Sequence, residues 1–404
     1  MSAYAKLVKF TFLIAILTAV GQMTQTMYVP AIGQMASEFA VTPGSLQAVM
    51  ACYLIPYGLS QFVYGPISDR LGRKPIILFG LAVYVLGTLI ALFSPNYMLF
   101  LAGSFIQGLG VGCGGAMART LGRDRYSGVE LHKVNSLISM SIVFSPLLAP
   151  VLGGVLAENF GWRSSYLFLA LFGLAVVITM MTSFKETLPK ERRRNEKVSQ
   201  SYKFVMANKR FQGYLICLVA TFSGLAIFEA AAGVLLGGVL KLPATTVSIL
   251  FILPIPGYLV GSAISSILAT RCTTNTILNV GLGAITLGSV VILIPGVLGY
   301  TSAISLVAGA ALYFLGTGIV YPSATTGALT PIPNHAGTGG AVLGGMQNLV
   351  AGLATLLASL VPAPNQMPLG IFMLVMSLMA VYGMMKVHKC PEPVDESEEV
   401  PLTI

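Results

Sequence analysis

The chain alternates between long apolar runs and short polar connections. A helix needs about 20 mainly apolar residues to cross a bilayer, and twelve runs reach that length. The predicted spans of the first half are 10–32, 44–67, 75–94, 97–118, 134–156 and 165–184. Those of the second half are 212–238, 245–269, 276–298, 302–326, 337–361 and 367–387. We therefore expect an all-α integral membrane protein with twelve transmembrane helices.

The basic residues between these spans predict the orientation of the chain. All of the 23 Lys and Arg except Arg163 and Lys241 fall in the same set of connections, which includes both termini. The cytoplasmic side of a membrane protein carries the excess of Lys and Arg. We expect both termini to be cytoplasmic. The net charge of +9 then reflects the basic residues on the cytoplasmic side and does not indicate a nucleic-acid partner.

Composition excludes a soluble protein. Charged residues make up 9% of the chain and hydrophobic residues 55%, whereas soluble globular proteins carry roughly 25% charged residues. The mean hydropathy is +0.83. The chain has no nucleotide-binding P-loop and no HExxH zinc motif. We expect no enzymatic activity, no metal and no cofactor, so that any pumping draws on an ion gradient.

The connections divide the spans into two groups of six. The predicted units are an N-terminal six-helix bundle at 1–184, a charged cytoplasmic linker at 185–211, a C-terminal bundle at 212–390 and an acidic cytoplasmic tail at 391–404. A weak repeat relates the fourth span of each half at an offset of 208. It pairs Gly108 with Gly316, Gly110 with Gly318 and Leu121 with Leu329. Two pseudo-symmetric bundles with a central cavity between them are typical of secondary transporters.

Five stretches carry a resemblance to a known family. GPISDRLGRKP at 65–75 matches the loop motif of the major facilitator superfamily between its second and third spans. APVLGG at 149–154 is similar to the antiporter motif of the fifth span, with Ala149 in place of its first Gly. The segments 20–32, 114–121 and 245–256 resemble bacterial drug/proton antiporters of the EmrD type. The resemblance extends over essentially the whole chain.

The resemblance implies a function. Such proteins are inner-membrane multidrug efflux transporters that exchange protons for hydrophobic or amphipathic, often cationic, compounds by alternating access. We expect the same here, with a monomeric protein, the lipid bilayer, drug-like substrates and protons as partners, and the proton gradient as the energy source. A transporter of one specific metabolite is the main alternative. A non-transporting receptor or scaffold is a remote one.

One acidic residue lies within a predicted span. Glu229 of span seven has no Lys, Arg or His within several turns on its helix. An ionisable residue in a span costs about 2.5–3.5 kcal/mol on insertion scales, so it is a functional hypothesis by default. Burial disfavours the charged carboxylate, and Glu229 could exchange a proton near neutral pH. Proton coupling is the predicted role; a structural hydrogen bond that never titrates is the alternative.

Polar and aromatic stripes in spans one and two predict the lining of the cavity. Residues spaced three or four apart share one helical face, and a polar face is penalised in contact with lipid. Aromatic rings with polar groups suit flat amphipathic cations, although polar side chains also join neighbouring helices. The predicted substrate-binding residues are Gln22, Gln25, Tyr28, Tyr53, Tyr57, Gln61, Met117, Phe228 and Phe251. Met117, Phe228 and Phe251 are candidates for apolar walls, although general packing explains them better.

The loop motif predicts a conformational latch at the cytoplasmic edge. An acid there can meet the positive N-terminus of a neighbouring helix in one conformation only. The latch residues are Gly65, Asp69, Arg70, Gly72, Arg73 and Lys74. In the family this motif is taken to stabilise the outward-facing state. Positive-inside topology alone explains the bases but not Asp69.

Two further sets complete the predicted site. The family's span-four motif carries an Arg at the position of Ser104, and Arg119 is either a replacement cation in the cavity or an anchor at the inner face. Residues that interrupt helices or permit close packing predict bends in spans five and eight. These residues are Pro150, Gly153, Gly154, Pro254 and Pro256. Packing without a role in gating explains them equally.

Overall fold

The computed structural model describes residues 3–126, 128–189, 191, 198–269, 271–332 and 335–390. The first-half helices are α1 Ala3–Thr26, α2 Ile32–Glu38, α3 Gln47–Leu71, α4 Arg73–Leu92, α5 Tyr97–Arg125, α6 Gly128–Phe160 and α7 Arg163–Ser183. The linker holds α8 Val198–Ala207. The second-half helices are α9 Lys209–Gly233, α10 Ala244–Ile252, α11 Ile255–Leu268, α12 Thr274–Val297, α13 Ala303–Leu329, α14 Ala336–Ser359 and α15 Met367–His388. The described residues hold no β-strand.

The twelve predicted spans are confirmed as helices. Eleven helical segments are long and apolar enough to cross a membrane within the residues searched. The remaining span, predicted at 134–156, lies inside the 33-residue helix α6. Span eight consists of two helices, because α10 ends at Ile252 and α11 begins at Ile255. Pro254 stands at this break, where its ring ends the regular helical hydrogen bonding.

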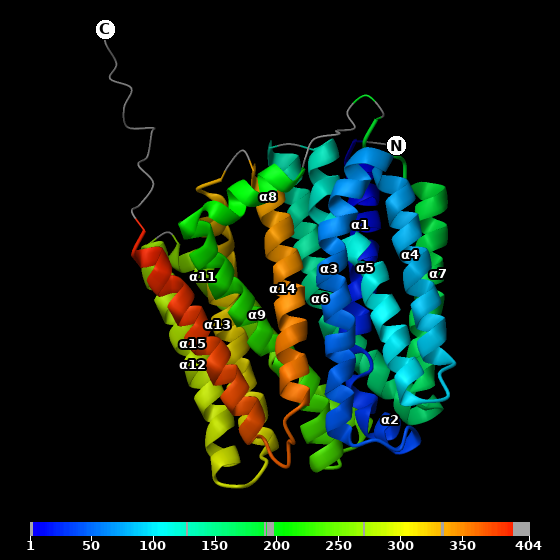
Figure 1. The fold of residues 1–404 in the computed structure, drawn as a ribbon, viewed down its shortest axis with the longest axis vertical. Coiled ribbons are helices and arrows are strands. Elements are labelled where there is room, and N and C mark those ends of the chain that lie inside the picture. Colours follow the sequence, from blue (N-terminus) through cyan, green and yellow to red (C-terminus); the bar gives the residue numbers. More distant parts are fainter. Residues whose placement is uncertain are drawn as a thin grey trace.

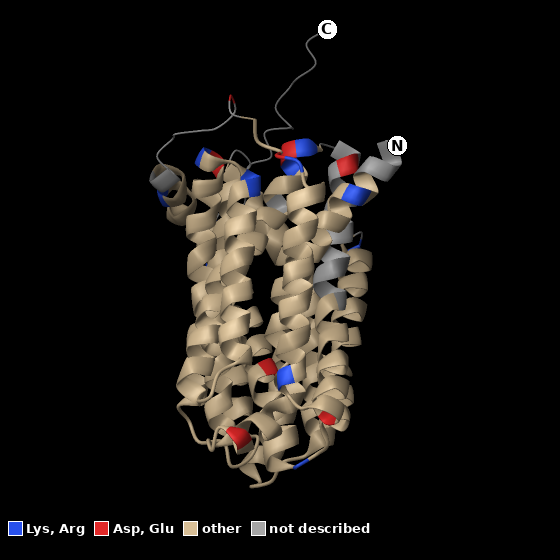
Figure 2. Ribbon diagram, turned by 90° about the vertical axis from the view of Figure 1, so that its right-hand side faces the viewer, with Lys and Arg blue, Asp and Glu red and all other residues tan. Residues whose placement is uncertain are grey.

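The helices run side by side, so the bundle has two ends (Figure 1). We call the end where α1 begins and α15 finishes the terminal end, and the other the opposite end. Charged residues gather at these two ends, above all at the terminal end, and leave most of the helix length uncharged (Figure 2). Large apolar side chains such as Phe79 and Leu287 point outward from the bundle. This distribution is that of a multi-pass membrane protein.

Glycines set the packing of corresponding helix pairs in the two halves. Gly80 and Gly87 of α4 face Gly110 and Gly103 of α5, and a Cβ at any of the four would overlap the backbone or side chain of the partner helix. Without a hydrophobic force between helices in lipid, such close backbone contact is a main source of helix association. The second half repeats this arrangement between α12 and α13. There the facing pairs are Gly281 with Gly316 and Gly288 with Gly309.

These contacts confirm the internal repeat and correct its register. Gly110 and Gly316 occupy equivalent positions, as do Gly103 and Gly309, which corresponds to an offset of 206 residues. The sequence comparison predicted 208 and paired Gly108 with Gly316. The predicted offset was wrong by two residues because glycines recur at every second position in this part of α5. Several offsets therefore align an equal number of glycines.

The most extensive helix packing between the two halves joins α3 with α14 and α6 with α10. Gly58 of α3 packs on Gly345 and Leu349 of α14. The helices α3 and α14 lie side by side at the centre of Figure 1. Ser248 of α10 donates a hydrogen bond to the carbonyl of Pro150 in α6, at 2.8 Å. A side-chain hydrogen bond, described below, also links α1 with α9.

The opposite end is closed by contacts between the halves. The short helix η1 Val29–Ala31 packs on α9 and α10, and α2 packs on η4 Val234–Val239, a π-helical extension of α9. A Cβ at Gly233 would overlap the carbonyl of Val29, and one at Gly238 would lie against Pro43. Both halves therefore contribute backbone to this seal.

Candidate functional site

A buried hydrogen bond joins the halves in the interior of the bundle. The Gln25 side chain of α1 donates from Nε2 to Oε2 of Glu229 in α9, at 2.6 Å. Glu229 is 5% exposed and Gln25 4%. Charge-assisted hydrogen bonds are roughly twice as strong as neutral ones. The structure thus brings together one predicted proton-coupling residue and one predicted substrate-binding residue.

Tyr28 adds a second polar group beside this pair. It follows the end of α1 and is 3% exposed. Its hydroxyl lies within electrostatic range of Glu229 but has no hydrogen-bond partner among the described residues. A buried hydroxyl without a partner is costly, so Tyr28 offers a donor and an acceptor that a ligand, a water molecule or a moved side chain can use.

The predicted residues of α3 lie against the same stretch of α1. The Tyr53 hydroxyl donates to the carbonyl of Gly21 at 2.7 Å, one turn before Gln25. The Tyr53 and Tyr57 rings pack edge to face with centroids 5.8 Å apart. Gln61, one turn further along α3, is buried between α5 and α14, where it lies against Gly115 and Gly344. The α3 stripe therefore faces the protein interior, as its polarity predicts.

The predicted apolar residues belong to packed clusters. Phe228 of α9 stacks on Phe251 of α10, with centroids 6.2 Å apart, and meets Phe314 of α13 edge to face. Met117 is fully buried in the cluster formed by α1, α3 and α5. These contacts fit general packing, one of the two roles open for them from sequence. Gln22, by contrast, is half-buried on α1.

The residues predicted to bend helices lie at contacts between helices. A Cβ at Gly153 would overlap the carbonyl of Met27, and one at Gly154 would overlap the Ser248 hydroxyl of α10. Pro150 lies within α6, and Pro256 stands in the first turn of α11. Each of these glycines allows α6 to approach another segment at backbone distance.

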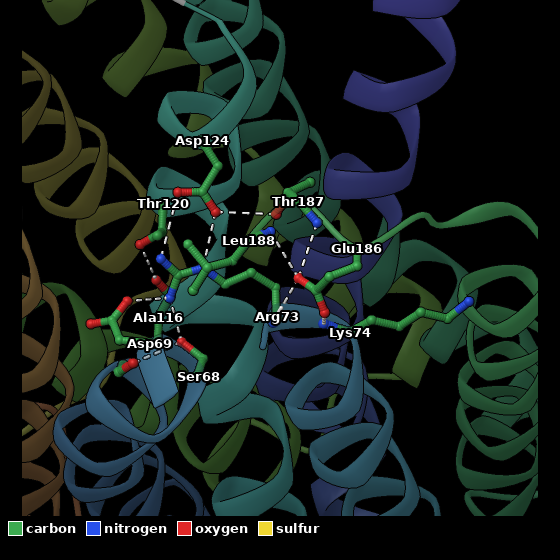
Figure 3. Close-up of polar contacts among 11 residues, drawn as sticks. Ser68, Asp69, Arg73, Lys74, Ala116, Thr120, Asp124, Glu186, Thr187 and Leu188 are labelled. Carbon is green, nitrogen blue, oxygen red and sulfur yellow. Dashed lines mark hydrogen bonds and ion pairs between the residues drawn. The ribbon is translucent and has the colours of Figure 1, made fainter. Parts of the chain in front are cut away.

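Arg73 is the centre of a charge cluster at the terminal end, within the predicted latch (Figure 3). Its Nε lies 2.9 Å from Oδ2 of Asp124 in α5, and its Nη1 lies 2.6 Å from Oδ1 of Asp69. Nη1 also donates to the Ser68 hydroxyl at 2.6 Å. The Arg73 side chain is only 5% exposed. The planar guanidinium suits such a site because its donors point in several fixed directions.

Gly72 and Glu186 shape the backbone around Arg73. Gly72 separates α3 from α4 with φ of 104°, a left-handed conformation that glycine adopts without strain. Glu186, just after α7, accepts hydrogen bonds from the backbone N–H groups of Arg73 at 2.9 Å and Lys74 at 3.1 Å. The carboxylate therefore caps the N-terminus of α4, where the free N–H groups and the helix dipole favour an anion.

The remaining latch residues are more exposed. The Asp69 side chain is 46% exposed, and its ion pair in the described part of the chain is with Arg73 of the same half. Lys74 donates from Nζ to the carbonyl of Met181 at 2.8 Å. Arg70 points to the surface, and a Cβ at Gly65 would meet nothing within 4 Å. The side chain of Arg119 lies outside the described residues.

Glu186 has a lowered pKa for a clear reason. Burial alone raises the pKa of this carboxyl, but hydrogen bonds from the backbone amides of Leu188, Arg73, Lys74 and Thr187 outweigh it and hold the pKa below its ordinary 4.5. The unfolded chain therefore takes up the proton first as the pH falls. The cap stabilises the fold fully above about pH 5 and loses this effect as the pH falls through the folded-state pKa.

Replacing Glu186 tests this cap. We expect Glu186→Ala to lower the free energy of unfolding by about 1 kcal/mol at pH 7, the typical cost of a lost helix cap. The difference from the unchanged protein should shrink toward pH 4, where the cap protonates. Denaturant unfolding in detergent micelles at both pH values measures it, with the exposed Glu191→Ala as control. A difference that stays constant with pH contradicts a charged cap.

Sequence reasoning missed Asp124, Glu186 and Thr187. Thr187 donates its hydroxyl to Oδ2 of Asp124 at 3.1 Å, so the start of the linker joins the cluster around Arg73. The available signal was weak: Glu186 lies two residues and Asp124 six residues beyond the end of a predicted span, and each stands next to a basic residue. An unpartnered arginine at the start of span three could have prompted a search for such acids.

Comparison with known proteins agrees with this architecture. Multidrug resistance protein D of Escherichia coli is 42% identical over 374 residues, which cover 93% of this chain and 94% of that protein. The Bicyclomycin resistance protein homolog of Haemophilus influenzae is 26% identical over 358 residues, with coverage of 87% and 89%. The fold is similar to that of the xylose transporter XylE from E. coli in a partially occluded inward open conformation. That structure has a TM-score of 0.74 and 14% identity, with coverage of 95% of this chain and 98% of that one.

The family profile gives the assignment. It matches residues 14–355, which include the charge cluster around Arg73, the Gln25–Glu229 pair and the break at Pro254. The match therefore extends over both halves and the linker between them. With the twelve membrane-spanning helices and the relatives above, it shows that the chain belongs to the Major Facilitator Superfamily.

Proposed function

We propose that this chain is a proton-coupled multidrug efflux transporter of a bacterial inner membrane. The observation that carries the proposal is the buried Gln25–Glu229 hydrogen bond between the two halves. It places a titratable carboxylate at the contact that has to change when the halves move. Relatives named for multidrug and bicyclomycin resistance support an exporter of drug-like compounds. No cofactor is needed, because the proton gradient supplies the energy.

The proposed cycle uses the two halves as rigid bodies. They comprise residues 1–184 and 212–390, joined by the linker 185–211 and followed by the tail 391–404. The described basic residues gather at the terminal end, so we assign that end to the cytoplasm. With this assignment, the contacts that close the opposite end lie on the periplasmic side. Movement of one half against the other would open this seal.

The surroundings of Glu229 suit a hydrophobic or amphipathic cation. Tyr28, Tyr53, Tyr57, Gln22 and Gln25 supply aromatic faces and neutral polar groups from α1 and α3. Aromatic faces attract cations, and a carboxylate that has lost its proton adds a negative charge. In this scheme the drug and the proton compete for Glu229, which exchanges one for the other across the membrane.

Transport by the unmodified protein tests the proposal. Inside-out membrane vesicles are energised so that their interior becomes acidic, and uptake of several lipophilic cationic dyes is followed by fluorescence. We expect uptake into the vesicles that stops when a protonophore collapses the gradient. The dyes should also dissipate the pH gradient when added to vesicles that contain the protein.

Two results would contradict parts of this proposal. Uptake that continues after the gradient has collapsed excludes proton coupling. Failure of every dye and lipophilic cation, with the protein present and folded, excludes multidrug transport and favours the transporter of a specific metabolite.

A further inference from the structure

The outer wall of the second half carries a groove that the transport pathway does not use. It lies between α12 and α15 and has a volume of about 530 Å³. Both helices stand at the edge of the bundle away from the first half (Figure 1). Two apolar residues of its lining, Leu287 and Met385, are more than half exposed. In a membrane protein this surface faces lipid.

The groove matches one leaflet of a bilayer in length and position. Its α12 wall runs from Asn279, near the terminal end, to Val290. At about 1.5 Å per residue these residues extend along roughly 16 Å. The hydrocarbon core of a bilayer is about 30 Å thick, so one leaflet measures about 15 Å. An acyl chain lying along the groove would remain within the leaflet at the terminal end.

A glycine forms the hollow in the middle of the groove. Gly283 lies in the lining, and a Cβ at this position would meet no atom within 4 Å. Two other glycines of α12, Gly281 and Gly288, pack against α13. Gly283 therefore has no role in helix packing, and its missing side chain leaves open space on the lipid-facing wall.

Apart from Thr286, whose hydroxyl donates to the carbonyl of Leu282 in its own helix, the polar and basic groups stand at one end of the groove. Asn279 and His388 line it at the terminal end. Lys389 follows directly on α15, and Arg271 precedes the start of α12 by three residues; both are exposed. The described residues place no acid in the lining. This arrangement, apolar along the leaflet and basic at the headgroup level, complements an anionic phospholipid.

We propose that the groove between α12 and α15 binds one phospholipid with an anionic headgroup. The acyl chain lies along the groove over Gly283. The phosphate sits at the terminal end, where Asn279 and His388 can donate hydrogen bonds and Lys389 and Arg271 supply positive charge. Aromatic and basic residues at helix ends commonly interact with headgroups at this level. Here the apolar groove extends from these residues toward the middle of the membrane.

Native mass spectrometry of the delipidated protein tests the site. The protein is titrated with phosphatidylglycerol or with phosphatidylcholine that has the same acyl chains. We expect one phosphatidylglycerol to bind before any others and more tightly than phosphatidylcholine. Gly283→Phe should weaken binding of this first lipid roughly tenfold, the loss expected when about two methylene groups lose their contacts. Ile294→Phe, on the exposed face of α12 outside the groove, serves as the control for added bulk.

The headgroup end is tested separately. Lys389→Gln combined with His388→Gln should remove the preference for phosphatidylglycerol while weaker binding of phosphatidylcholine persists. This double variant leaves the middle of the groove intact and controls for a folding defect in Gly283→Phe. Equal binding of both lipids to all variants would show non-specific lipid coating and overturn the proposal. A dimer that Gly283→Phe dissociates would identify the groove as a subunit interface and overturn it as well.

Discussion

Glu229→Gln should reduce proton-driven uptake of a lipophilic cation to the level of vesicles that lack the protein. Glutamine retains the size of the side chain and a carbonyl oxygen that can accept the hydrogen bond from Gln25. It cannot gain or lose a proton. The variant therefore separates the titration of the group from its place in the structure, because the contact between α1 and α9 can still form.

A second measurement distinguishes coupling from simple loss of structure. Exchange of labelled drug across the membrane in the absence of a proton gradient should persist in Glu229→Gln with weaker drug binding, because the aromatic and amide groups remain and movement of the halves does not require net proton transfer. Glu130→Gln, an exposed acid in the first turn of α6, is the control and should leave both activities unchanged. Undiminished proton-driven uptake in Glu229→Gln would assign Glu229 to the structural role.

Glu229→Asp provides the complementary test. The carboxylate remains but is one methylene shorter, so its distance to Gln25 Nε2 increases. We expect a weaker transporter that still depends on the proton gradient. The unpartnered hydroxyl of Tyr28 lies within electrostatic range of this carboxylate and is available as an alternative donor when the side chain is displaced.

The twelve helices could be predicted because the signal for each is local. A run of about 20 apolar residues is enough to span the bilayer whatever its neighbours are, and all twelve predicted spans lie in helices. The break at Pro254 was equally local, because proline removes a backbone donor wherever it stands. The register of the repeat was not predictable in this way. It depends on which glycines face each other across α4 and α5, and their spacing along α5 permits several choices.

The contacts of the site depended on distances that the sequence does not contain. Gln25 and Glu229 could each be singled out as unusual within a span, but their hydrogen bond links residues 204 apart. Asp124 and Glu186 interact with Arg73 across 51 and 113 residues. An acid at the end of a span looks the same whether it faces water or an arginine. Only the packing of α4, α5 and α7 decides between these surroundings.

The second half joins the related helices α11 and α13 through neutral groups among its described residues. One turn before the end of α11, Ser265 donates to the carbonyl of Ile319 at 3.1 Å and lies 3.2 Å from the Ser323 hydroxyl. Neutral hydroxyls thus join α11 to α13 where charges join α3 and α4 to α5. The charged version in the first half therefore adds something beyond helix packing, which is consistent with a latch that responds to conformation.

Arg73→Ala should lower the free energy of unfolding by about 2–4 kcal/mol in detergent micelles. Removing one partner of a buried ion pair leaves the other charge without compensation, which typically costs about 3–5 kcal/mol. We expect a smaller loss here because Asp69 is almost half exposed and Asp124 is 15% exposed, so water can reach both. Chemical unfolding followed by tryptophan fluorescence of the single Trp measures the change.

Two variants make this prediction specific to the ion pairs. Arg70→Ala removes an exposed arginine three residues away and should change the free energy by less than about 0.5 kcal/mol, as is usual for surface substitutions. Adding Asp124→Asn to Arg73→Ala should recover part of the loss, because the unpaired carboxylate is then neutral and the two effects are not additive. If Arg73→Ala and Arg70→Ala have the same effect, the cluster contributes only charge at the membrane surface. If Arg73→Ala alone is strongly destabilising and Asp124→Asn recovers stability, the buried arginine holds α3, α4 and α5 together at the terminal end.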